Sequence, residues 1–110
     1  MTQDLIDPTI FEELQEAMGP EFATELLDTF LNDAANMFAS LEQAALAQDA
    51  DGYRRAAHSI KSNAQTFGAT ALADQARTIE LAGTINTAAI EPLRAMFEET
   101  ATALKGLIDE

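Results

Sequence analysis

The chain has 110 residues, enough for one domain with one hydrophobic core, and we expect residues 1–110 to form that single domain. The absence of cysteine excludes a disulfide framework and thiolate metal sites. A formal net charge of −13 argues against nucleic acid or an anionic membrane as a partner, because both are bound through many Lys and Arg side chains, and leaves a protein or a small cation.

Two helices are predicted in the first half of the chain. Asp7 and Pro8 form an N-cap followed by proline at the first helical position, which predicts a short helix ending at Met18, before Gly19. From Pro20 to about Gln48, apolar residues recur every three or four positions, which predicts a long helix. A second apolar line on this helix widens its core face or, alternatively, forms a docking or dimerisation patch. That line comprises Leu27, Leu31, Ala35 and Phe38.

Two further helices follow a turn at residues 49–52, in which Asp51 is the predicted N-cap. The spacing of apolar residues from Tyr53 to Phe67 predicts a helix that Gly68 ends as a C-cap. The next helix is expected over about Thr70–Leu81 and closes at Gly83.

The last helix carries a proline at position 92, which is not tolerated in a helix interior. The helix is therefore expected to begin near Ile90 or to follow a loose first turn, with Asn86 or Thr87 as its cap. Strand signals are missing from the whole sequence, and the loops are short. These features predict an all-α fold, an antiparallel up-and-down four-helix bundle with a short additional N-terminal helix.

His58 is the single histidine and lies in the one segment where positive charge gathers. Three of the six basic residues are within about one helical turn of it: Arg54, Arg55 and Lys61. At about 100° per residue, His58 falls roughly 140° from the centre of the core stripe, on the solvent side. The same side carries Arg54, Lys61, Ser62 and Gln65. The pattern indicates an exposed imidazole that receives an anion, interpreted as a phosphoryl group.

Other chemistries fit His58 less well. A metal site needs a second ligand one turn away, where the helix has Lys61 and Ser62. A serine hydrolase is disfavoured because Ser59 points to another face of the helix. A neutral imidazole is itself a nucleophile, and the two negative charges of a phosphoryl group would suit Lys61 and Arg54. The alternative without function is a surface histidine among cations that balance nearby acids.

Residues 57–69, AHSIKSNAQTFGA, resemble the signature of histidine-containing phosphotransfer (HPt) domains of bacterial two-component phosphorelays. In that signature the histidine is followed by an apolar residue, then Lys, usually Gly, and Gly-Ala ten positions after the histidine. The similarity continues through Leu72, Ala76, Ile79 and Glu80. Ser62 stands where the family usually has Gly.

The resemblance implies that His58 accepts a phosphoryl group from a receiver-domain aspartate, or from a kinase, and passes it to another receiver. Lys61 would support the phosphoryl group electrostatically, and the binding surface would include Arg54, Ser62, Gln65 and Gly68. The chain would be a phospho-carrier without cofactor or nucleotide-binding loop rather than an enzyme, with Mg²⁺ held by the receiver partner.

The expected partners are response-regulator receiver domains and a sensor or hybrid histidine kinase, with no nucleic acid and no membrane, and the chain is expected to be a monomer. No apolar run approaches the roughly 18–20 residues of a membrane span, and no leader is visible, which predicts a cytoplasmic, free-standing protein. A variant of this interpretation is a phospho-accepting domain excised from a chemotaxis-type kinase. Two alternatives of a different kind also remain. One is an interaction module that sequesters a receiver without accepting phosphate, and the other is a structural bundle that dimerises through Leu27, Leu31 and Phe38.

Overall fold

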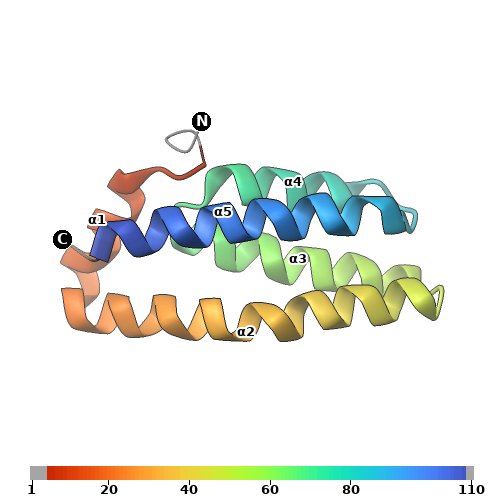
Figure 1. Cartoon of the computed structure of the whole chain (residues 1–110), viewed down its shortest axis with the longest axis horizontal. Coiled ribbons are helices and arrows are strands. Elements are labelled where there is room, and N and C mark those ends of the chain that lie inside the picture. The colour runs from red at the N-terminus through yellow and green to blue at the C-terminus, as the bar shows by residue number, and fades with distance from the viewer. Residues whose placement is uncertain (1–4, 109–110) are drawn as a thin grey trace.

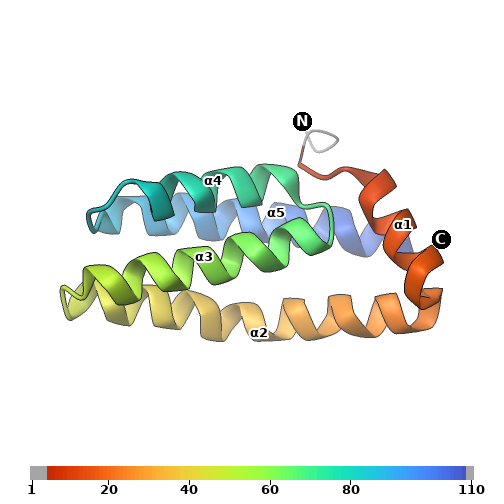
Figure 2. The same cartoon turned by 180° about the vertical axis from the view of Figure 1, so that it is seen from behind.

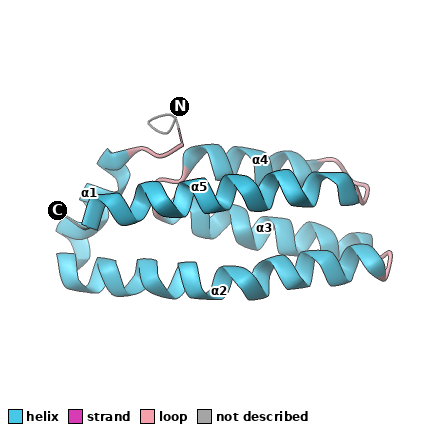
Figure 3. Cartoon of the chain, in the orientation of Figure 1, coloured by secondary structure: helices cyan, strands magenta, loops and turns pink. Residues whose placement is uncertain are grey.

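Helices make up nearly all of residues 5–108, the part of the chain that the computed structural model describes (Figure 3). They are α1 (Pro8–Met18), α2 (Pro20–Leu46), α3 (Ala50–Thr66), α4 (Thr70–Leu81), the 3-10 helix η2 (Thr87–Ala89) and α5 (Ile90–Ile108). Helices α2 to α5 run alternately up and down along the long axis, and α1 lies across the end of the bundle where α2 begins (Figures 1 and 2). The predicted all-α bundle with a short leading helix is confirmed.

Local signals placed most helix boundaries correctly. The Asp7 carboxylate accepts a hydrogen bond from the Thr9 N–H at 3.1 Å and caps α1, with Pro8 at the first helical position. Between α1 and α2, Gly19 adopts a φ of 91°, a conformation that glycine adopts without a side-chain clash, and Pro20 opens α2.

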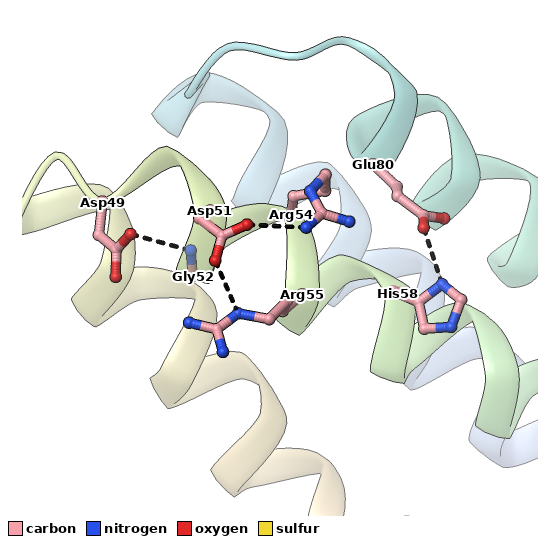
Figure 4. A network of polar contacts seen from close by, with 7 residues as sticks. All are labelled: Asp49, Asp51, Gly52, Arg54, Arg55, His58 and Glu80. Atoms are coloured by element: carbon pink, nitrogen blue, oxygen red, sulfur yellow. Dashed lines mark hydrogen bonds and ion pairs between the residues drawn. The ribbon is translucent and has the colours of Figure 1, made fainter.

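The predicted N-cap of α3 was wrong by two residues. The N-cap is Asp49 rather than Asp51: Asp49 has extended backbone angles, and its carboxylate accepts from the Gly52 N–H at 3.0 Å. Asp51 lies inside the first helical turn, where its carboxylate pairs with Arg54 and Arg55 instead of capping the helix (Figure 4). Helix α2 correspondingly ends at Leu46, two residues before the predicted end.

The proline of α5 is accommodated in the first turn of the helix. Helix α5 begins at Ile90, so Pro92 takes the third position, where a backbone N–H would have no partner within the helix. Before it, the short η2 is capped by Asn86, whose side chain accepts from the Ala88 N–H at 3.1 Å. The helix therefore starts where the sequence predicted.

The second apolar line of α2 belongs largely to the core. Leu27 is fully buried and Phe38 is 4% exposed, while Leu31 is partly buried against the same core. A dimer formed through these three residues would require two buried side chains to leave the core, so that alternative is wrong. Aromatic side chains connect α2, the end of α3 and α5 in the core. Phe30 of α2 stacks on Phe67, the residue after α3, with 5.3 Å between ring centroids, and it packs edge-on against Phe97 of α5.

Gly68 joins the α3–α4 turn to the start of the described chain. Its carbonyl oxygen accepts a hydrogen bond from the Asp7 N–H at 2.7 Å, and its φ is 79°. A Cβ atom at this position would lie 2.6 Å from the Asp7 carbonyl oxygen. Gly68 is buried by this close approach. These contacts give Gly68 a structural role, and its expected place in a binding surface stays a prediction.

Within residues 5–108, none of the helices combines the length and the apolar character needed to cross a bilayer.

Candidate functional site

His58 lies on the outward side of α3, as its helical position predicts, with 55% of its side chain exposed. Its ring is held on one edge only. The Nδ1 atom is 2.7 Å from Oε2 of Glu80, which reaches across from α4 (Figure 4). The other ring nitrogen, Nε2, has the Ser62 hydroxyl 3.5 Å away, at the outer limit of a hydrogen bond. The imidazole is thus oriented by α4 while its far edge remains open.

The carboxylate of Glu80 is largely enclosed between α3 and α4, with 11% of its side chain exposed. The Lys61 ammonium lies 2.8 Å from Oε1, off the direction of a well-formed hydrogen bond, so this contact is primarily an ion pair. The Lys61 contact lowers the pKa of Glu80, burial opposes this effect, and the His58 contact adds to the lowering. Glu80 is therefore ionised at neutral pH.

The charge of Glu80 determines the tautomer of His58. An ionised carboxylate can only accept a hydrogen bond, so Nδ1 must donate one. In the neutral ring the proton is then on Nδ1, and Nε2 carries the free lone pair. The exposed nitrogen is consequently the nucleophilic one. The sequence does not predict this contact, because Glu80 is recognisable there only as part of a motif and its pairing depends on how α4 is aligned with α3.

Lys61 does not lie free beside the imidazole. Only 18% of its side chain is exposed, and its ammonium is committed to Glu80. In this structure Lys61 holds the carboxylate that holds the ring, and its electrostatic support of a phosphoryl group on His58 stays a prediction.

Arg54 is also engaged elsewhere. Its guanidinium lies 2.7 Å from Asp51, and Arg55 reaches the same carboxylate at 3.2 Å, so both turn toward Asp51 rather than toward His58 (Figure 4). The hydrogen bond from Arg54 is the main cause that lowers the pKa of Asp51. Such exposed pairs contribute little to stability, and a stronger anionic ligand can compete for the arginine.

Ser62 and Gln65 are exposed on the same side of α3, one and two turns after His58. Their short or flexible polar side chains leave the surface beside Nε2 accessible to another protein. Among the described residues, no group of three or more His, Asp or Glu side chains is placed to hold a metal ion.

Comparisons with known proteins agree with this geometry. The family model described as "Hpt domain" matches residues 25–110. The crystal structure of histidine-containing phosphotransfer protein B (HptB) from Pseudomonas aeruginosa PAO1 superposes with a TM-score of 0.86, at 29% identity, covering 96% of this chain and 95% of that chain. No curated protein matches the sequence. Because the family model spans well over half of its length, the chain belongs to the Hpt domains, the histidine phosphotransfer modules of phosphorelays.

Proposed function

We propose that this protein is a phosphorelay intermediate in which Nε2 of His58 accepts a phosphoryl group from a receiver-domain aspartate, or from a kinase, and passes it to another receiver. The observation that carries this proposal is the 2.7 Å contact between Nδ1 of His58 and the ionised Glu80. It supports Nε2 as the nucleophile, since that nitrogen has the lone pair and lies on the accessible edge of the ring.

The transfer step follows from this arrangement. The Nε2 lone pair attacks the phosphorus of the aspartyl phosphate, and an N–P bond forms as the P–O bond to the aspartate breaks. The aspartate leaves as a carboxylate with the bonding electrons. Nδ1 keeps its proton, so the phosphorylated ring carries a positive charge, which the negative charge of Glu80 stabilises at 2.7 Å. Reversal of the same step delivers the phosphoryl group to the next receiver.

The side chains around Nε2 leave the remaining catalytic groups to the partner. In the proposed complex, Mg²⁺ would be held by the receiver, where it would neutralise the charge of the phosphoryl group. Ser62 is small enough to let the receiver's aspartate approach Nε2. Arg54 can exchange its exposed contact with Asp51 for a contact with the phosphoryl group, because charge-assisted bonds to phosphate are stronger than an exposed ion pair.

The proposal is tested by mixing the protein with phosphorylated receivers and following the label on a phosphate-affinity gel, with His58→Gln as the control. We expect an acid-labile, base-stable phosphoryl group that is absent from the variant. In protein with ¹⁵N-labelled histidine, phosphorus–nitrogen coupling should appear at Nε2. Binding of a receiver without any label would instead favour the sequestering module, and coupling at Nδ1 would contradict the assigned role of Glu80.

A further inference from the structure

The basic residues of this acidic protein are mostly committed to carboxylates. Lys61 pairs with Glu80, Arg54 and Arg55 pair with Asp51, and Arg94 pairs with Glu42 and Glu91. The other two basic residues, Arg77 of α4 and Lys105 of α5, are exposed, and no carboxylate of residues 5–108 lies within ion-pairing distance of either. Of these two, Arg77 lies on the helix that contacts His58. In a chain with 19 acidic and 6 basic residues, an arginine without an acidic partner is available for another anion.

Arg77 lies on α4 close to Glu80, the residue that contacts His58. Arg77 precedes Glu80 by three residues, so it lies about 60° further around the helix, on the side of Glu80 that faces away from the core. Glu80 itself is level with His58 and Lys61, which it contacts on α3. Arg77 therefore lies at the outer rim of the α3–α4 contact, next to the residue that orients the imidazole.

Helices α3 and α4 are antiparallel, so a residue nearer the start of α4 lies beside a residue nearer the end of α3 (Figures 1 and 2). Three residues toward the start of α4 correspond to about 4.5 Å toward the end of α3. The Nε2 atom is displaced the same way, since its neighbour is Ser62, one turn after His58. A group bound to Nε2 and the Arg77 side chain thus project over the same part of the surface.

We infer that Arg77 is a binding residue for the phosphoryl group carried on Nε2, supplying the cation that Lys61 cannot supply because it is bound to Glu80. This inference rests on the proposed phosphorylation of His58. A guanidinium can present two parallel N–H donors to phosphoryl oxygens, and it needs no rearrangement of an existing ion pair to do so. Arg77 stabilises the phosphorylated state and leaves the unphosphorylated site unchanged.

The experiment compares Arg77→Gln with Lys105→Gln, which removes the same charge from the last turn of α5. Each variant and the wild type are equilibrated with one phosphorylated receiver, and the ratio of phosphohistidine to aspartyl phosphate is measured. For Arg77→Gln we expect this ratio to fall about two- to fivefold, the size of an exposed charge-assisted contact. Lys105→Gln should match the wild type, and Arg77→Lys should recover part of the loss.

A second measurement distinguishes a direct contact between Arg77 and the phosphoryl group from a long-range electrostatic effect of the arginine charge. The protein is phosphorylated with phosphoramidate alone, and the side-chain Nε–Hε resonance of Arg77 is followed by ¹⁵N NMR. A shift of this resonance on phosphorylation, with that of Arg94 unchanged, supports the contact. If phosphohistidine forms but Arg77→Gln leaves the ratio unchanged, the assignment of Arg77 is wrong while the proposed function stands. If no phosphohistidine forms in the wild type, both are wrong.

Discussion

Oε2 of Glu80 and Nδ1 of His58 are 2.7 Å apart, although the two residues are 22 positions apart in the sequence and belong to different helices. The carboxylate is mostly enclosed and also binds Lys61, so the packing of α4 on α3 sets the orientation of an exposed ring. A surface histidine usually samples several rotamers. Here the ring is pre-oriented with its free nitrogen outward, which would lower the entropic cost of reaching the geometry of the proposed transfer.

The charge of Glu80 should matter more than its shape. Glu80→Gln retains an oxygen that can accept from Nδ1–H but removes the negative charge that stabilises the phosphorylated ring, and charge-assisted hydrogen bonds are roughly twice as strong as neutral ones. We expect phosphoryl transfer to slow roughly tenfold with the helical content unchanged. Rapid-quench kinetics measures the rate, and Glu12→Gln, an exposed change on α1, controls for net charge. Equal rates in the two variants would contradict the role of Glu80.

Lys61 should act through Glu80. Lys61→Met removes the ammonium that holds the carboxylate, so transfer should slow or the lifetime of phosphohistidine should shorten while the fold persists. In the Glu80→Gln background the same change should cost less than about twofold, because residues that act through one contact are not additive. A double-mutant cycle on the transfer rate measures this coupling. Fully additive losses would indicate that Lys61 contacts the phosphoryl group directly.

Gly68 should be the glycine whose substitution is most costly to stability. Both Gly68 and Gly83 have φ above 70°, but a Cβ at Gly68 would meet the Asp7 carbonyl oxygen, whereas the space at Gly83 is open. Gly83→Ala should cost about 1–2 kcal/mol from backbone strain alone. Gly68→Ala should cost more than this by at least about 1 kcal/mol, since backbone must move. Urea unfolding gives both values, and equal midpoints would contradict the structural role of Gly68.

The lowered pKa of Glu80 predicts a dependence of stability on pH. A carboxyl group whose pKa is lower in the folded state stabilises the protein above its unfolded pKa, about 4.3 for Glu, and this contribution is lost as pH falls through the folded pKa. The stability difference between the wild type and Glu80→Gln should therefore be constant near neutral pH and shrink below about pH 4. Urea unfolding of both proteins from pH 7 to pH 2 measures the difference. A difference that grows on acidification would contradict the assigned sign.

Much of the fold was readable from local sequence. Caps and breakers such as Asp7, Pro20 and Gly68 mark helix ends through backbone chemistry that acts over a few residues. The error at α3 is equally local in origin. Asp49 and Asp51 both lie near its first turn, and Asp49 caps the helix while Asp51 pairs with Arg54 and Arg55.

The sequence by itself determined that the chain is a helical bundle and that His58 faces solvent, because a period of 3.6 residues assigns each side chain to one face of its own helix. Only the tertiary structure decided which partners those side chains meet. The contacts of Glu80 with His58 and Lys61 require one alignment of α4 against α3, and helical periodicity does not specify the alignment between helices. Side-chain packing in the core does, and it thereby leaves Nε2 as the open nitrogen of the ring.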